Sequence, residues 1–134
     1  MIIGIGISVI DICRFSKDVF KNKRLMNRSY TPVEQMYLKD KDALALAELY
    51  AAKEAVIRAL CNDFQGFSPH DIEILYDEFG MPSVIFHERV LGILKNQVRK
   101  QHKQDGAEHF TQLCISHTDE IAVATAIITI SSSK

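Results

Sequence analysis

Three charged side chains lie close together in a segment that reads as a helix. The residues from Ala43 to Cys61 are rich in Ala, Leu, Glu and Lys and include no glycine or proline, which predicts a helix. Lys53 and Arg58 could bind phosphate oxygens, and the carboxylate of Glu54 could hold a divalent metal ion. Enzymes that transfer phosphate groups combine cations and metal-binding carboxylates in this way. The segment is therefore a candidate phosphate-transfer site.

A simpler interpretation of the same residues remains open. Glu54 and Arg58 are four positions apart with the acid first, the favourable order for an ion pair on a helix surface. Such pairs are common, and from composition alone the ion pair is the favoured interpretation. Lys53 is different because it interrupts an apolar stripe, where a cation needs a partner. The stripe consists of Leu46, Tyr50, Ile57 and Leu60.

Ser116 and His117 could suggest a nucleophile beside its base. They lie at the end of a predicted strand, where adjacent side chains point to opposite faces and so do not readily meet. No G-x-S-x-G motif surrounds the serine. A hydrolase is therefore disfavoured.

Gly4 and Gly6 superficially match a dinucleotide-binding motif. No strand precedes them, the third glycine is missing and no helix begins there, so the match fails. We interpret them as glycines within a buried strand, where they permit the close approach of another backbone or a bulge.

The remaining elements alternate between strands and helices. Thr31, Pro32 and Glu34 form a typical helix start with a capping box, and Gly80 supplies the turn of a hairpin. Strands at both ends with helices between them indicate a single α+β domain over residues 1–134. The expected strands are Ile2–Ile10, Ile72–Tyr76, Pro82–Phe86, Phe110–Ser116 and Ile121–Ile130; the expected helices are Asp11–Lys23, Thr31–Lys39, Ala43–Cys61 and a last one through Val90–Val98.

Composition limits the class of protein. The 134 residues are 47% hydrophobic and 25% charged, with a net charge of −1, which is typical of a globular domain and gives no global field for nucleic acid or membrane. Cys13, Cys61 and Cys114 are far apart and odd in number, so a disulfide framework or zinc site is not expected. The apolar N-terminal segment has no basic leader and is broken by Asp11, so we expect neither a signal peptide nor a membrane span. A cytoplasmic protein is expected.

The chain resembles the holo-acyl-carrier-protein synthase type of 4′-phosphopantetheinyl transferase in the order and spacing of several motifs. The family pattern G-I-G-x-D-x-x-E-x-x-R-F matches G-I-G-I-S-V-I-D-I-C-R-F over residues 4–15, and R-F-A-A-K-E-A-x-x-K-A matches L-Y-A-A-K-E-A-V-I-R-A over residues 49–59. The family's S-I-S-H corresponds to C-I-S-H at residues 114–117. Residues 30–35, 71–74 and 80–82 resemble its F-T-x-x-E, D-I-E-V and G-K-P segments.

The resemblance implies an α+β 4′-phosphopantetheinyl transferase fold with a small antiparallel sheet, assembled as a homotrimer with active sites between subunits. It implies transfer of the 4′-phosphopantetheine group from coenzyme A to a serine of an apo acyl or related carrier protein. Fatty acid and lipid biosynthesis is the expected setting, and the sequence leaves the carrier protein and the pathway open. Mg²⁺ would lie between position 8, Glu54 and the coenzyme A pyrophosphate. Lys53, Arg58, Ser116 and His117 would lie by the cofactor.

The resemblance also implies that basic residues of the first helix meet an acidic helix of the carrier protein. The segment from Arg14 to Arg28 is basic, which suits an acidic partner. The candidates are Arg14, Lys17, Lys21 and Arg24, with Lys23 and Arg28 nearby.

The chain departs from the family at three positions. Ser8, Leu49 and Met81 replace an aspartate, an arginine and a lysine, respectively. Because the aspartate is a metal ligand, two hypotheses remain. The protein is a working transferase, as the retained Lys53, Glu54 and His117 suggest, or it has impaired or lost catalysis and binds coenzyme A or a carrier protein as a binding module.

Overall fold

A three-stranded antiparallel sheet with the order β1-β5-β4 forms the base of the structure. The computed structural model describes residues 1–19, 22–60, 68–102 and 108–131. Strand β1 (Ile2–Asp11) pairs with β5 (Ile121–Ser131), which pairs with β4 (Glu108–His117). Strands β2 (Ile72–Tyr76) and β3 (Pro82–Phe86) form a separate hairpin. The predicted α+β class is confirmed.

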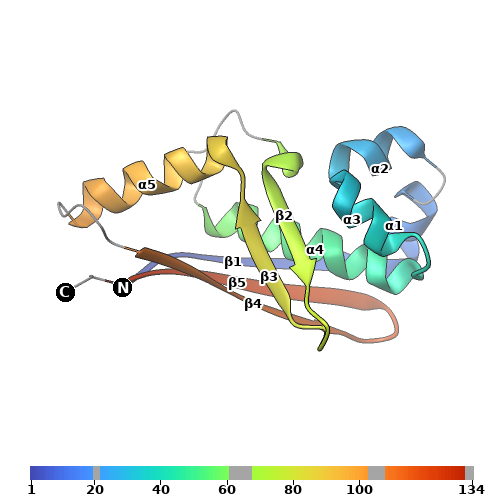
Figure 1. Ribbon diagram of the computed structural model, residues 1–134. Coiled ribbons are helices and arrows are strands. Elements are labelled where there is room, and N and C mark those ends of the chain that lie inside the picture. The colour runs from blue at the N-terminus through green and yellow to red at the C-terminus, as the bar shows by residue number, and fades with distance from the viewer. Residues whose placement is uncertain (20–21, 61–67, 103–107, 132–134) are drawn as a thin grey trace.

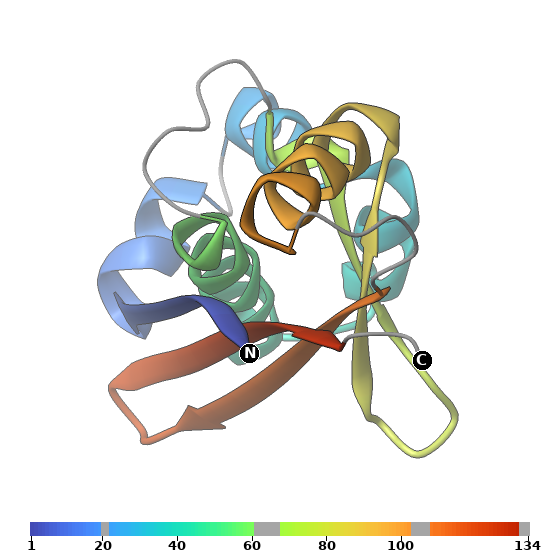
Figure 2. The same cartoon turned by 90° about the vertical axis from the view of Figure 1, so that its left-hand side faces the viewer.

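The helices lie on one face of the three-stranded sheet (Figure 1). The central helix α4 packs on β1 and β5. Figure 2 looks roughly along α4 and shows it over the sheet, and in neither view does a described helix or strand cover the opposite face. The helices are α1 (Ile12–Val19), α2 (Lys23–Ser29), α3 (Pro32–Leu38), α4 (Ala43–Ala59) and α5 (Glu88–His102), with the 3₁₀ helix η1 (Pro69–Asp71) before β2.

Strand β1 and helix α4 approach each other so closely that two glycines are required. A Cβ atom built on Gly6 would lie 1.8 Å from the carbonyl oxygen of Ala55, and one on Gly4 would lie 1.7 Å from that of Ala59. The ladder also shifts register between Ile2 and Gly4. Of the two alternatives predicted for these glycines, the close approach of another backbone is confirmed at both. The α4 residues that face these glycines are alanines. Helix α4 is therefore buried over a wider face than the apolar stripe that was predicted from the sequence.

Helix starts follow the predicted caps. Thr31 and Glu34 form the complete capping box of α3. The Asp11 carboxylate accepts a hydrogen bond of 3.0 Å from the backbone N–H of Arg14 at the start of α1. The prediction of one helix from Asp11 to Lys23 was wrong, because α1 ends at Val19 and a separate helix, α2, begins at Lys23.

The outer face of the sheet is apolar. Along β1, Ile5, Ile7 and Val9 are 56%, 55% and 57% exposed, and Phe110 on β4 is 50% exposed. On the other face of the sheet, which packs against the helices, β5 side chains such as Ala124 and Ile128 are fully buried. The sheet therefore has one core face and one bare apolar face. Among the described residues, no helix is long and apolar enough to cross a membrane.

Candidate functional site

Arg58 joins helix α4 to the edge strand β1. Its Nη1 donates a hydrogen bond of 2.6 Å to the carbonyl oxygen of Ile7, and its Nη2 forms an ion pair with Glu54 Oε1. The side chains of Arg58 and Glu54 are 54% and 27% exposed. The ion pair expected from their spacing is thus present, and it places a fixed guanidinium at the protein surface beside position 8.

Ser8 lies next to this cluster in sequence but points into the core. The residue is 1% exposed, and its Oγ has no hydrogen-bond partner within the described part of the chain. It belongs to the face of β1 that packs on α4, whereas Ile7 and Val9 point outward. An unpartnered buried hydroxyl costs free energy, so position 8 is a departure from ordinary core packing.

Tyr50 also belongs to this side of α4, and the sequence reasoning assigned it no chemical role. Its ring packs on Phe15 of α1 with the centroids 4.7 Å apart. Burial raises the pKa of the Tyr50 hydroxyl above its usual value; the carboxylate of Glu54 adds to this rise, and Arg58 opposes it. Tyr50 lies one helical turn before Glu54, and this spacing was the signal in the sequence that could have placed it beside the candidate site.

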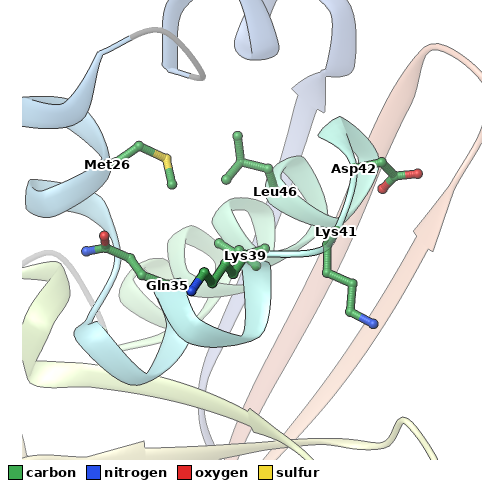
Figure 3. A pocket seen from close by; sticks show the side chains of 7 residues that line it. Met26, Gln35, Lys39, Lys41, Asp42 and Leu46 are labelled. Carbon is green, nitrogen blue, oxygen red and sulfur yellow. The ribbon is translucent and has the colours of Figure 1, made fainter.

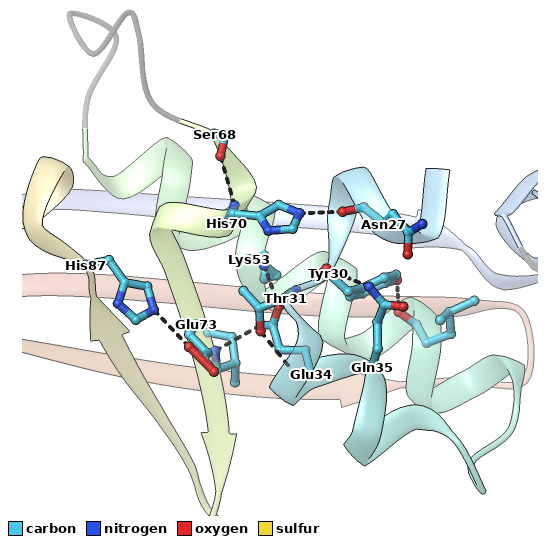
Figure 4. A network of polar contacts seen from close by, with 12 residues as sticks. Asn27, Tyr30, Thr31, Glu34, Gln35, Lys53, Ser68, His70, Glu73 and His87 are labelled. Atoms are coloured by element: carbon cyan, nitrogen blue, oxygen red, sulfur yellow. Dashed lines mark hydrogen bonds and ion pairs between the residues drawn. The ribbon is translucent and has the colours of Figure 1, made fainter. Parts of the chain in front are cut away.

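Lys53 does not face the surface in this chain. Its ammonium group lies 2.5 Å from Glu34 Oε1, and the two side chains are 3% and 0% exposed. Glu34 also accepts hydrogen bonds from the backbone N–H groups of Thr31 and Ile74, at 2.8 and 3.0 Å. Figure 4 shows Lys53 and Glu34 at the centre of this polar network. Burial lowers the pKa of Lys53, and the hydrogen bond and charge of Glu34 oppose that shift.

In the single chain, this geometry directs the Lys53 ammonium group to Glu34 and away from the protein surface. The contact of Lys53 with coenzyme A stays a prediction from the resemblance. The Lys53 cation, which interrupts the apolar stripe, has Glu34 as its partner. In the single chain, this pair positions α4 against α3 and β2. Sequence analysis assigned Glu34 only a capping role. Its pair with Lys53 could not be predicted, because only tertiary packing brings the two residues together.

His117 and Ser116 lie at the far edge of the sheet from β1. His117 Nδ1 is 3.7 Å from Glu48 Oε1, and both Ser116 and His117 are exposed. His117 and Ile10 both pair with Ala122, so β5 separates them by two strand spacings, roughly 10 Å. The single chain therefore brings Glu54 and Arg58 together and keeps His117 apart from them.

The predicted carrier-binding residues are only partly described. Arg14 on α1 and Arg24 on α2 are exposed, as are Lys23 and Arg28. Lys17 belongs to α1, but its side chain is outside the described set, and Lys21 lies outside the described residues altogether.

A pocket of about 250 Å³ opens between α2, α3 and the start of α4. Its apolar floor comes from Met26, Leu38 and Leu46, and Figure 3 shows Lys39 and Lys41 at its rim. No residue predicted for the chemical site lines it, so it is a separate feature of the helical side of the molecule.

The comparison with known proteins decides the family. Residues 4–125 match the model of the 4′-phosphopantetheinyl transferase superfamily. The chain belongs to this superfamily. The holo-[acyl-carrier-protein] synthase of Clostridium perfringens (strain SM101) is 34% identical over 130 residues, covering 96% of this chain and 94% of its own. That of Alkaliphilus metalliredigens is 36% identical over 131 residues, covering 96% and 100%.

Solved structures of holo-acyl-carrier-protein synthases share the fold of this transferase-superfamily chain. The Bacillus anthracis protein, in complex with CoA (3′,5′-ADP), is 30% identical with a TM-score of 0.73, covering 98% of this chain and 99% of its own. The Helicobacter pylori protein, in complex with coenzyme A, is 26% identical with a TM-score of 0.74, covering 93% and 99%.

The side chains at the predicted metal position of this superfamily member do not provide a suitable set of ligands for Mg²⁺. Mg²⁺ is bound through carboxylates and waters with near-octahedral geometry. Glu54 is already paired with Arg58, the Ser8 hydroxyl is enclosed, and Asp11 caps α1. Within residues 1–19, 22–60, 68–102 and 108–131, no three His, Cys, Asp or Glu side chains form a metal-binding group. The magnesium requirement therefore stays a prediction from resemblance.

The other two departures from the family pattern have different surroundings. Leu49 is fully buried in the core, so an arginine at this position could not reach solvent in the single chain without repacking α4. Met81 is 63% exposed beside Gly80 in the β2–β3 turn, where core packing does not constrain the choice of side chain.

Proposed function

We propose that the protein transfers the 4′-phosphopantetheine group from coenzyme A to a serine of an apo acyl carrier protein. The observation that carries the proposal is the family match over residues 4–125, with relatives that are named holo-[acyl-carrier-protein] synthases and cover nearly the whole chain. Two solved relatives hold coenzyme A or its 3′,5′-ADP part, which supports coenzyme A as the donor.

The transfer exchanges a phosphoanhydride bond of the coenzyme A pyrophosphate for a phosphate ester bond to serine. The serine oxygen forms a bond to the phosphorus atom that carries the pantetheine arm, the bond from this phosphorus to the bridging oxygen breaks, and 3′,5′-ADP leaves. Arg58, with its exposed guanidinium, would contact the phosphates, and Glu54 would accept the serine proton. Both residues belong to α4 and lie beside the edge strand β1, to which Arg58 is hydrogen-bonded, so a second macromolecule can approach them there.

A homotrimer completes the proposed site. The bare apolar face of the sheet, with Ile5, Ile7, Val9 and Phe110 each at least half exposed, is the kind of surface that another subunit covers. Because His117 and Ser116 lie at the opposite sheet edge from Arg58, a site built by two subunits can use the edge of each. His117 and Ser116 would then contact coenzyme A bound to a neighbouring subunit.

The acyl carrier protein would dock on the basic side formed by α1 and α2. Arg14 and Arg24 are exposed there, and Lys17 and Lys21 belong to the same stretch of sequence. Clustered cations speed the encounter with an acidic partner and orient it. A reaction between coenzyme A and an acyl carrier protein suits a cytoplasmic protein.

The competing function is a binding module without catalysis. Ser8 favours it, because the hydroxyl at the predicted metal position is neutral and buried. Both functions are tested by incubating the protein with coenzyme A and apo acyl carrier protein and measuring the intact mass of the carrier. A mass gain of one phosphopantetheine group supports the transferase. Coenzyme A binding without any mass gain supports the module.

A further inference from the structure

The phosphate-binding region of this chain has an unusual balance of charge. Position 8 contributes a neutral hydroxyl, Glu54 contributes one negative charge, and Arg58 contributes one positive charge. Glu54 and Arg58 are paired, so their charges cancel locally. A site without net negative charge attracts a divalent cation weakly, whereas it does not repel a pyrophosphate.

Arg58 is held in a defined position by two bonds. Nη1 donates to the Ile7 carbonyl at 2.6 Å, and Nη2 pairs with Glu54 Oε1. Strand β1 is an edge strand, so its outer backbone groups lack a neighbouring strand and can be used by side chains. A guanidinium carries five N–H donors, which leaves donors for an anion after these two contacts. With 54% of its side chain exposed, Arg58 presents them to solvent.

The alternative source of positive charge, a metal ion at position 8, is opposed by the packing. The Ser8 Oγ is enclosed between β1 and α4 and has no hydrogen-bond partner among the described residues. A bound cation would have to lie between this strand and helix, which pack so closely that even a Cβ atom on Gly6 would lie 1.8 Å from the Ala55 carbonyl oxygen. The hydroxyl therefore cannot act as a surface ligand without separating strand and helix.

Building on the transferase function proposed above, we propose that Arg58 takes the place of a metal ion, so that this chain binds the pyrophosphate of coenzyme A without magnesium. The guanidinium suits this role because its planar fork makes two parallel hydrogen bonds to a phosphate. Its anchoring to Ile7 and Glu54 also reduces the conformational freedom that binding would otherwise remove.

Calorimetric titration of the full chain with coenzyme A tests this inference. In EDTA and in excess MgCl₂ the dissociation constants should agree within about twofold, well under the tenfold that one strong charged contact provides. Arg58→Met should weaken binding by about tenfold or more in EDTA. Lys41→Met removes one positive charge from the exposed segment between α3 and α4, to which no role in the proposed site is assigned, and should leave coenzyme A binding unchanged.

The variant Glu54→Gln further distinguishes binding by Arg58 without metal from binding through a magnesium ion. In the metal-free site Glu54 makes no contact with the pyrophosphate, so the variant should bind coenzyme A about as tightly as the wild type, while the transfer rate falls. A wild type that binds at least tenfold tighter with magnesium, and loses this gain in Glu54→Gln, overturns the inference.

The outcomes for binding and for transfer remain distinct. Magnesium-dependent binding together with modification of the carrier protein overturns the inference and leaves the transferase standing. Magnesium-independent binding without modification supports the inference and contradicts the proposed transferase.

Discussion

Lys53 Nζ lies 2.5 Å from Glu34 Oε1 in the interior of the protein, although the two residues come from different helices. Glu34 also binds the backbone N–H groups of Thr31 and Ile74. One carboxylate thereby connects α3, α4 and β2. The helix that presents Glu54 and Arg58 is held in place through this buried pair.

Removing one partner of the pair should destabilise the protein strongly. Lys53→Met leaves the Glu34 carboxylate buried without its cation, and we expect a loss of about 3–5 kcal/mol in the free energy of unfolding. The double variant Lys53→Met with Glu34→Gln removes both charges and should lose clearly less than the sum of the single variants. Urea denaturation of the four proteins measures this, and additive losses would show that the pair is uncoupled.

Gly6 should tolerate no side chain. Its added Cβ would lie 1.8 Å from the Ala55 carbonyl oxygen and 2.6 Å from the Ala59 backbone nitrogen, and backbone atoms cannot rotate away. Gly6→Ala should therefore cost more than about 3 kcal/mol or prevent folding. Gly92→Ala is the matched control, because a Cβ at that helical position meets nothing within 4 Å. It should stabilise by about 0.5–1 kcal/mol. Equal thermal midpoints for both variants would contradict the packing of β1 on α4.

Alkaline pH should destabilise the fold through Tyr30. Its hydroxyl donates to the Leu46 carbonyl at 2.7 Å, and burial raises its pKa above the usual value of about 10. The folded state keeps this proton while the unfolded chain loses it, so stability is complete below pH ~10 and falls as the pH rises further, by up to about 1.4 kcal/mol per pH unit.

The comparison with Tyr30→Phe isolates this effect. Tyr76, whose pKa is also raised, and Lys53, whose lowered pKa gives a slope of the opposite sign, are present in both proteins. The stability gap between wild type and variant, measured by urea denaturation, should therefore narrow above pH 10. A gap that stays constant to pH 11 would contradict the raised pKa.

The apolar sheet face should control assembly. Ile5→Lys places a charge on the bare face of β1, and we expect it to convert a trimer into monomers in sedimentation experiments. Met36→Lys changes a residue that is 77% exposed on α3 and should leave the oligomeric state unchanged. A wild-type protein that sediments as a monomer would contradict the trimer.

Local signals in the sequence predicted much of the fold. The β2–β3 hairpin has the expected bounds, because its strand residues are bounded by a turn in which Gly80 adopts a φ of 79°. The α3 capping box was predicted for the same reason. Helix α2 was missed because it is short and mostly polar, and its signal was the cap at Asn22, whose side chain accepts hydrogen bonds from two backbone N–H groups.

The candidate site was less accessible to sequence reasoning. The Glu54–Arg58 pair follows from helical spacing alone. The bond from Arg58 to Ile7 and the pairing of Lys53 with Glu34 depend on how distant segments pack, which no local pattern reports. Ser8 was singled out by family resemblance, and only the structure showed that its hydroxyl is enclosed.

The central claim is tested most directly by the intact mass of an apo acyl carrier protein after incubation with this protein and coenzyme A. Wild type should add one phosphopantetheine group to each carrier molecule and release an equal amount of 3′,5′-ADP, and Glu54→Ala should abolish most of this conversion while coenzyme A binding persists. A carrier whose mass stays unchanged, across several acyl carrier proteins and with or without magnesium, would contradict the transferase function.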